Sequence, residues 1–352
     1  MKRIRIHASA EYDVLIGSGL LSGLPAYVRS LGDVSDVCVV SDDLVYPLYG
    51  ESSARVLREA GLRTVSFVFP HGESHKTLET YQSLVEYLAD VAFPRSGLLV
   101  AVGGGVTGDL TGFAAATFRR GVRFLQIPTS LLAAVDASVG GKTALDLPAA
   151  KNQIGCFYHP CLVLCDTATF STLPETEYRN GCAEIIKYAM LDDPAFCTSL
   201  LRRPVRDRYP SVVAKCVEKK RFYVEQDELD GSIRNMLNFG HTFGHAIEAC
   251  SGYRIPHGKA VAAGMAIITR AAAGFRICSP ETPAFLERLL NAYGLPDGTD
   301  FTADELAKEA VRDKKADGEN IRLIVPEAVG RCSVRTVPVA GLKDWLRAGG
   351  CK

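Results

Sequence analysis

Short apolar segments with the composition of β-strands recur through the first half of the chain. They are DVCVVS (36–41), TVSFVF (64–69), LLVAVGG (98–104), RFLQIP (123–128) and CLVLCD (161–166). Segments with helical spacing, such as YQSLVEYLADVA, lie between several of these strands. This alternation predicts a mostly parallel sheet with helices on its faces.

The pattern changes after about Pro174. The long segments EYRNGCAEIIKYAML, HTFGHAIEAC and GKAVAAGMAIITRAAAGF have apolar positions at helical spacing, and only IRLIVPEAVGRCSV near the end indicates a hairpin. We therefore expect an α/β plus α protein, with an α/β domain over residues 1–174 and a mainly helical domain over residues 175–352. No internal repeat is present.

Composition narrows the class of protein. The chain has 352 residues, enough for two domains, and 47% of them are apolar. Forty basic residues balance forty acidic ones, so no net charge favours nucleic acid or anionic membranes as partners. The first residues alternate in polarity like a strand, unlike a signal peptide, and no apolar run approaches the roughly 18 residues of a membrane span. Eleven cysteines without a CxxC pair indicate reduced thiols in a cytoplasmic protein.

A glycine-rich turn follows one of the predicted strands. GGGVTGD (103–109) opens a helical segment, and the amide groups of a helix start favour an anion such as phosphate. It is not the GxGxxG fingerprint, and a plain tight turn between strand and helix is an alternative interpretation. Asp109 can cap this helix or bind a ligand hydroxyl.

A second polar region follows the fourth predicted strand. PTSLLAAVDASVGGKTALD and AAKNQIG place Asp136, Lys142, Lys151 and Asn152 close together in the sequence. A single lysine is usually a solvated surface residue, but two lysines beside a Gly-Gly turn and a carboxylate suit a polar ligand. Arg119 and Arg120 precede Gly121 and can offer bidentate contacts to phosphate or carboxylate.

Candidate metal ligands lie in the second half. His241 and His245 are four residues apart in NFGHTFGHAIE, so a helix places both imidazoles on one face. Glu184 and Lys187 in AEIIKYAM have the spacing of a surface ion pair. Together with His257 in PHGKA, Glu184 and the HxxxH pair supply enough ligands for a metal with an open position.

The order of these motifs resembles that of a known family. GGGVTGDLTGFAAATFRRG, IPTSLLAAVDASVGGKTALD, KNQIGCFYHP, AEIIKYAM, LNFGHTFGHAIE and IPHGKAVAAGM together resemble 3-dehydroquinate synthase over nearly the whole chain. The resemblance implies conversion of 3-deoxy-D-arabino-heptulosonate 7-phosphate to 3-dehydroquinate and phosphate in the shikimate pathway. It also implies catalytic NAD, a divalent metal (zinc, or cobalt), a homodimer, and a Rossmann-like nucleotide-binding domain followed by a helical domain with the site in the cleft between them.

The resemblance assigns roles residue by residue. It places the metal ligands at Glu184, His241 and His257, and makes His245 a substrate-site residue instead of a ligand. The positions that match its catalytic and substrate residues are Asp136, Lys142, Asn152, Lys187, Lys220, Arg234, Asn238, His245, Lys314 and Arg120, the last reaching the phosphate of the neighbouring subunit. The positions that match its NAD contacts are Asp42 (or Asp43), Glu73, Lys76, Gly104, Gly105, Val106, Asp109, Thr129, Ser130, Lys142, Lys151, Asn152, Thr172 and Leu173.

Three other functions compete with this one. A sugar-phosphate cyclase that makes an epi-valiolone or a deoxy-inosose acts on substrates without the carboxylate that Arg234, Lys220, Asn238 and His245 are expected to meet. A glycerol-type alcohol dehydrogenase needs fewer anion-binding residues and releases NADH. A silent binding protein does not need an intact set of ligands and lysines. Two residues depart from the family. Ser130 stands where Thr is common and keeps the hydroxyl, and Ala137 stands where many members have Ser, which removes one possible cofactor hydrogen bond. Neither puts the activity in doubt.

Overall fold

The computed structural model describes residues 1–148, 150–313 and 319–352. The chain forms two compact units. Unit 1 comprises Met1–Pro174 and Tyr209–Leu229, and unit 2 comprises Glu175–Arg208 and Asp230–Lys352. Each unit has its own elements and its own core.

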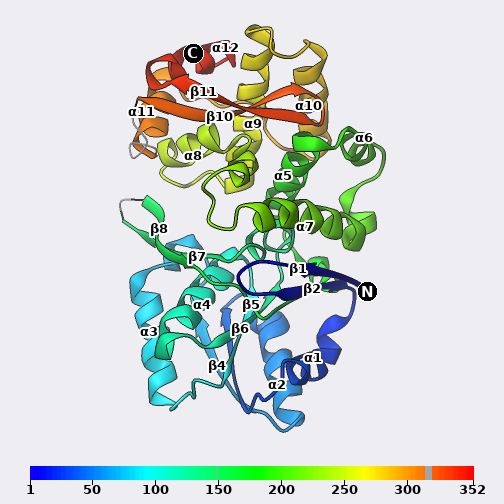
Figure 1. The fold of residues 1–352 in the computed structure, drawn as a ribbon, viewed down its shortest axis with the longest axis vertical. Helices are drawn as coiled ribbons and strands as arrows, with labels where there is room; N and C mark the ends of the chain where they lie inside the picture. The colour runs from blue at the N-terminus through cyan, green and yellow to red at the C-terminus, as the bar shows by residue number, and fades with distance from the viewer. Residues whose placement is uncertain (149, 314–318) are drawn as a thin grey trace. The chain divides into compact units, whose positions relative to one another are not determined.

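Unit 1 is built on a seven-stranded sheet with the order β1-β2-β9-β6-β5-β3-β4 (Figure 1). Strands β1 and β2 pair antiparallel, and the other pairs are parallel. The expected mostly parallel sheet is confirmed. The strands of this sheet are β1 (Lys2–Ile6), β2 (Tyr12–Gly17), β3 (Asp36–Asp42), β4 (Arg63–Phe69), β5 (Leu98–Gly103), β6 (Arg123–Pro128) and β9 (Leu162–Asp166).

Helices cover both faces of this sheet, because side chains alternate along its strands. Val37 and Val39 of β3 pack with α1 (Leu24–Ser30) and α2 (Glu51–Glu59) on one face. The intervening Cys38 and Val40 pack with α3 (Leu78–Asp90) and α4 (Gly105–Thr117) on the other face. A strand buried on both faces reads as a continuous apolar run, which explains why DVCVVS shows no polar alternation.

Two further elements complete unit 1. Strands β7 (Lys142–Leu147) and β8 (Ala150–Phe157) form an antiparallel hairpin outside the main sheet. Helix α7 (Tyr209–Gln226) packs against β1, β2 and the short turn Ala133–Ala137. The sequence-based division at residue 174 assigned this helix to the second domain, whereas its apolar face is buried in unit 1. Helical periodicity identifies a buried face but not the surface that buries it.

Unit 2 is mainly helical, as expected, and carries the late hairpin. Helix α9 (His257–Gly274) is buried along most of its length and packs against α5, α8, α10, α12 and β10. The other elements are α5 (Glu175–Asp192), α6 (Pro194–Arg202), α8 (His241–Cys250), α10 (Glu281–Ala292), α11 (Ala303–Asp313), α12 (Leu342–Ala348), β10 (Asn320–Ala328) and β11 (Arg331–Pro338).

Two expectations from composition concern the whole chain. Within the described ranges, no helix combines the length and the apolar character needed to cross a bilayer. All eleven cysteines carry free thiols, in agreement with the expectation that they form no disulfide framework.

Candidate functional site

The carboxyl ends of β3, β5 and β6 bring together several positions expected to contact a nucleotide. After β3 the chain first adds β4 on one side, and then returns to add β5 on the other side. Ligands of open α/β sheets bind where the strand order reverses in this way. Asp42 ends β3 there, and its carboxylate accepts bonds from the amides of Leu44 (3.1 Å) and Val45 (2.9 Å) and from the Thr107 hydroxyl (3.3 Å).

The glycine run joins β5 to α4 in a tight turn. Gly104 is the N-cap residue and provides no side-chain cap for the helix, so the first amides of α4 are directed to whatever lies before the helix. A Cβ on Gly103 would lie 2.3 Å from Thr107 Oγ1. This strand-to-helix contact therefore requires glycine.

Asp109 does not cap this helix. Because α4 begins at Gly105, Asp109 lies in its second turn, and the capping interpretation is wrong. Its carboxylate instead lies 2.6 Å from Lys76 Nζ. Burial raises the pKa of Asp109, and the Lys76 ammonium opposes this shift.

Lys76 is the centre of a buried polar network in unit 1. Its side chain is 5% exposed, and its ammonium also lies 2.5 Å from Asn152 Oδ1 and 3.9 Å from Glu73 Oε1. Burial alone lowers the pKa of Lys76, but the Asp109 and Glu73 carboxylates outweigh it and raise the pKa. Lys151 Nζ also lies 3.9 Å from Glu73. Three of the expected cofactor contacts, Glu73, Asp109 and Asn152, are thus brought together around the Lys76 ammonium.

The β7–β8 hairpin presents Asn152 to this network. The backbone of Asn152 is left-handed (φ 55°), a conformation that Asn tolerates better than most residues. The carboxylate of Asp146 accepts the Asn152 amide (2.8 Å), and the Asp146 amide donates to the Lys76 carbonyl (2.8 Å). Asp146 therefore ties both chain segments together. Lys142 is exposed at the start of β7.

A second buried ion pair of unit 1 joins two expected substrate residues. Lys220 of α7 lies 2.6 Å from Asp136 Oδ1 and donates to the Asp136 carbonyl, also at 2.6 Å. Its side chain is almost completely buried. This pair joins α7 to the turn Ala133–Ala137, and both residues belong to unit 1.

The remaining expected contacts of unit 1 lie at turns. The Thr129 amide donates to the Gly103 carbonyl (2.9 Å), and Ser130 Oγ caps the turn at Ala133. The Thr172 hydroxyl lies 2.7 Å from the Tyr49 hydroxyl, and Leu173 follows it directly. Arg119 and Arg120 both have positive φ (50° and 64°).

Three candidate metal ligands converge in unit 2. Glu184 of α5 is fully buried, and its Oε1 lies 3.5 Å from Nε2 of both His241 and His257. His241 is the first residue of α8, and His257 is the first residue of α9. Two imidazole nitrogens and one carboxylate oxygen around one point are a typical zinc donor set with a position left open.

Both histidines turn the same nitrogen toward this point. His241 Nδ1 lies 3.1 Å from the Phe239 carbonyl, and His257 Nδ1 lies 3.1 Å from Glu248 Oε2. An Nδ1–H that donates to an oxygen leaves Nε2 as the metal-binding nitrogen. The donors therefore suit a divalent metal in both identity and orientation.

The charge distribution at this cluster is asymmetric. Burial lowers the pKa of His241 to about 3, against the opposing charge of Glu184. Burial also disfavours charge on His257, but its bonds to Glu184 and Glu248 outweigh this and raise its pKa to about 10. Lys187 pairs with Glu184 as the spacing suggested. Both residues are buried, so the surface location was wrong.

His245 lies next to this cluster. Its ring centroid is 5.4 Å from that of His241 and 6.1 Å from that of His257. His245, Glu248 and His257 form a second group of possible ligands that shares one imidazole with the first. His241 and His245 therefore have different neighbours in the structure, although their spacing in the sequence gives no reason to distinguish them.

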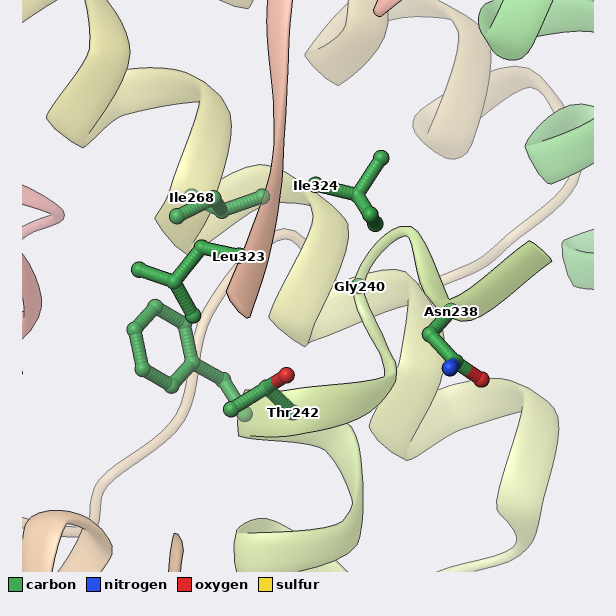
Figure 2. Close-up of a pocket in the computed structure, with 7 residues that line it drawn as sticks. Asn238, Gly240, Thr242, Ile268, Leu323 and Ile324 are labelled. Carbon is green, nitrogen blue, oxygen red and sulfur yellow. The ribbon is translucent and has the colours of Figure 1, made fainter. Parts of the chain in front are cut away.

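Two other expected substrate residues of unit 2 lie in the short helical turn Ile233–Asn238, just before α8. Arg234 is 2% exposed, and Asn238 Nδ2 lies 3.4 Å from Asn235 Oδ1. Asn238 also borders a small pocket at the start of α8, shown in Figure 2, whose other lining residues are Gly240, Thr242, Phe243, Ile268, Leu323 and Ile324. This lining is mainly apolar and includes no cation, so it does not suit a sugar phosphate. Lys314 lies outside the described residues.

Comparison with known proteins identifies the family. A family model described as 3-dehydroquinate synthase N-terminal matches residues 66–180, and one described as 3-dehydroquinate synthase C-terminal matches residues 181–316. The chain belongs to the 3-dehydroquinate synthase family. The family and the function expected from the sequence are confirmed, and that function is the formation of 3-dehydroquinate.

Individual relatives agree with this family. A 3-dehydroquinate synthase of Pelobacter propionicus is 42% identical over 332 residues, which cover 92% of each chain. One of Streptococcus suis is 38% identical over 346 residues, covering 96% of this chain and 98% of the relative. The fold resembles ValA, a 2-epi-5-epi-valiolone synthase from Streptomyces hygroscopicus subsp. jinggangensis with NAD+ and Zn2+ bound (TM-score 0.88, 25% identity, 99% of both chains).

Sequence reasoning did not single out two acidic residues of these clusters. Asp146 joins Lys76 to Asn152, and Glu248 meets His257. Glu248 is part of the quoted motif NFGHTFGHAIE, three residues after His245 and seven after His241, on the same helical face. That spacing was the available indication. Asp146 had none, because its contacts depend on a hairpin.

Proposed function

We propose that this member of the 3-dehydroquinate synthase family converts 3-deoxy-D-arabino-heptulosonate 7-phosphate to 3-dehydroquinate and phosphate, as a carbon–oxygen lyase that uses NAD and a divalent metal. The observation that carries the proposal is the buried Glu184–His241–His257 cluster, in which both Nε2 atoms face one carboxylate. The NAD+ and Zn2+ bound to ValA, which has the same fold, support both cofactors.

Glu184, His241 and His257 would hold the metal, zinc or cobalt. A divalent metal bound there supplies Lewis acidity that lowers the pKa of a coordinated substrate hydroxyl. Glu184 contributes the negative charge that favours a cation in this buried place. The Nδ1 bonds of the two histidines hold their rings in the ligating orientation.

Residues of unit 1 at the carboxyl ends of the sheet would bind NAD, which accepts a hydride and returns it later in the cycle. The helix start at Gly104–Val106 suits the pyrophosphate, and Asp42 suits a ribose hydroxyl. The buried network around Lys76 would hold several of the remaining NAD contacts in place. The remaining residues assigned to NAD are Glu73, Asp109, Thr129, Ser130, Lys142, Lys151, Asn152, Thr172 and Leu173.

The charged residues would bind the two anionic groups of the substrate. Lys142, Asn152, Lys187 and Arg120 are assigned to the phosphate, and Arg234 with Lys220 to the carboxylate. Asp136 would hold Lys220 in place through their 2.6 Å contact. His245, Asn238 and Lys314 are assigned to the substrate, and His245 can exchange a proton without leaving a ligand position.

Arg120 is assigned to the substrate of a neighbouring subunit, so we also propose a homodimer in the cytoplasm. The left-handed backbone of Arg119 and Arg120 supports a functional role for this turn, since such strain is kept mainly where function requires it. Light scattering should give twice the chain mass of 38.0 kDa. A monomer mass for the active enzyme would contradict this part of the proposal.

One assay tests the reaction. Purified protein with NAD, zinc and the heptulosonate phosphate should release phosphate, and the absorbance of NADH should not rise over many turnovers. Omission of NAD is the matched control. Sustained NADH production would indicate an alcohol dehydrogenase instead, and turnover of sedoheptulose 7-phosphate alone would indicate another sugar-phosphate cyclase.

A second experiment tests the ligand assignment. The variants His241→Ala and His257→Ala should each lose bound metal, because each removes one of three donors. His245→Ala should keep the metal and lose rate, since His245 is assigned to the substrate. Metal content after dialysis measures the difference, and equal loss in all three variants would contradict the assignment.

A further inference from the structure

Glu248 is a buried carboxylate that the proposed reaction does not use. It lies in the third turn of α8, and 3% of its surface is exposed. Its Oε2 lies 3.1 Å from His257 Nδ1, on the side of the imidazole opposite to the nitrogen that faces Glu184. Burial of a carboxylate is costly unless it is paired, so this contact has a structural or functional reason.

The chain around Glu248 also determines where α9, and with it His257, begins. The Glu248 carbonyl accepts bonds from the Ser251 hydroxyl (2.7 Å) and the Tyr253 amide (2.8 Å). Ser251 Oγ then accepts the Ile255 amide (3.2 Å). These bonds close the loop between α8 and α9, so Glu248 holds both the loop that leads to His257 and the ring of His257 itself.

An independent contact fixes the backbone of His257 relative to Glu184. The Gly258 amide donates to Asn180 Oδ1 (2.8 Å), and Asn180 lies one turn before Glu184 on α5. A Cβ on Gly258 would lie 2.5 Å from the Asn180 carbonyl oxygen. The backbone at the start of α9 is therefore set by α5, and the remaining freedom of His257 is the rotation of its ring.

We infer that Glu248 is a positioning residue of the metal centre, which holds the ring of His257 so that Nε2 faces the metal and Nδ1 keeps its proton. The inference rests on the proposed metal site. Partners of this kind outside the ligand set change metal affinity by about 10- to 100-fold when they are removed. Glu248 differs from Phe239, which binds His241 only through its carbonyl, because a carboxylate also adds negative charge next to the cation.

The alternative role for Glu248 is direct ligation. Glu248, His245 and His257 have donor atoms close enough to hold a cation themselves. A metal in that group would take Nδ1 of His257 and would make Glu248 a ligand. The two roles differ in the number of ions bound and in the ligand field of the metal, so both can be measured.

The experiment is a zinc titration of the metal-free protein against a competing chelator. Glu248→Ala should weaken zinc binding about 10- to 100-fold, and Glu248→Gln should lie between wild type and Glu248→Ala, since the amide oxygen still accepts the Nδ1 proton. The matched control is Glu287→Gln, which removes a carboxylate paired with Arg270 (3.0 Å) elsewhere in unit 2. The control should bind zinc like wild type.

Two further measurements separate the possible failures. The visible spectrum of the cobalt-loaded protein should be the same in wild type and Glu248→Gln, and each should bind one ion per chain; a changed spectrum or a second ion would make Glu248 a ligand and overturn the inference. The metal-free variants should unfold at temperatures similar to that of the metal-free wild type. A purely structural role of Glu248 would instead lower the unfolding temperature and would not produce the graded effect on zinc affinity.

If wild type itself binds no zinc, the proposed metal site fails. If wild type binds zinc and Glu248→Ala binds it equally well, only the role of Glu248 fails.

Discussion

Replacement of Lys76 by methionine is the sharpest test of the polar network in unit 1. Methionine keeps most of the length and apolar volume of the lysine side chain and removes its charge. The Asp109 carboxylate, now 2.6 Å from the Lys76 ammonium, would lose its nearest counter-charge. Because 5% of the Lys76 side chain is exposed, little water can replace the ammonium.

The structure gives both the size of the expected loss of stability and an upper limit to it. Loss of one partner of a buried ion pair destabilises a protein by about 3–5 kcal/mol. Asp109 can escape this penalty by taking up a proton, which costs about 4 kcal/mol at pH 7 for an aspartate of ordinary pKa. Its side chain is 20% exposed, and the water it meets reduces the penalty. We therefore expect a loss of about 2–4 kcal/mol at pH 7.

Because Asp109 can take up a proton, the loss of stability should depend on pH. In Lys76→Met the pKa of Asp109 lies above its unfolded value, since burial raises it and the Lys76 ammonium no longer opposes the shift. The penalty is then complete above the folded-state pKa and disappears as the pH falls below the unfolded-state pKa. At pH 5 the cost of protonation is only about 1.5 kcal/mol, so the destabilisation there should not exceed this value.

Thermal unfolding at pH 7 and pH 5 measures both effects. For a unit of this size, each kcal/mol lowers the transition by about 2–4 °C, and hydrogen exchange of α4 peptides assigns the change to unit 1. The double variant Lys76→Met/Asp109→Asn should show no such pH dependence, because the amide that replaces the carboxylate carries no charge. Lys343→Met, which breaks an exposed pair with Asp304, is the control and should cost less than about 1 kcal/mol. A stable Lys76→Met, or a loss that is equal at both pH values, would refute the reasoning.

Two further predictions concern other parts of the chain. Gly264→Ala places a Cβ 2.1 Å from the Gly240 carbonyl oxygen and 2.7 Å from the Gly244 amide; such overpacking should cost about 1–3 kcal/mol or more, and an unchanged unfolding temperature would contradict the close contact of α8 and α9. Burial raises the pKa of Glu228, but bonds from Ser9 and His159 outweigh it and hold the pKa below its ordinary value. Glu228→Gln should therefore be less stable than wild type at neutral pH and equally stable once the pH falls below the folded-state pKa; a difference that persists in acid would exclude this cause.

Local patterns predicted most of the elements of this fold. The parallel strands that are buried on both faces, such as β3 and β5, show as continuous apolar runs, and α5, α8 and α9 show as long helical patterns. The β7–β8 hairpin was not predicted, because Gly140, Gly141 and Pro148 interrupt the pattern and the strands are only partly buried. Helix α7 lies in the part of the chain expected to be mainly helical, but its partner surface depends on β1 and β2, about two hundred residues earlier in the chain.

The site was harder to predict from spacing alone. The HxxxH spacing pairs His241 with His245, whereas the structure places Nε2 of both His241 and His257 at Glu184. A helix cap was one interpretation of Asp109, because the start of α4 could not be located within the glycine run. Its true partner, Lys76, lies thirty-three residues earlier, and no local pattern connects two residues on different elements. The family resemblance supplied these residues as a set, but not the contacts that hold them.

The candidate metal ligands owe their position to contacts between backbones. His241 and His257 each start a helix, and the two helices approach so closely at Gly240, Gly244 and Gly264 that no side chain fits between them. Side chains can change rotamer, but a backbone contact of this kind can shift only if a whole helix moves. The glycines at this contact therefore fix the positions of the two ligand residues, while Glu248 and the Phe239 carbonyl fix the orientation of their rings. Position and orientation are set by different residues, so a substitution at Glu248 can weaken metal binding without displacing either helix.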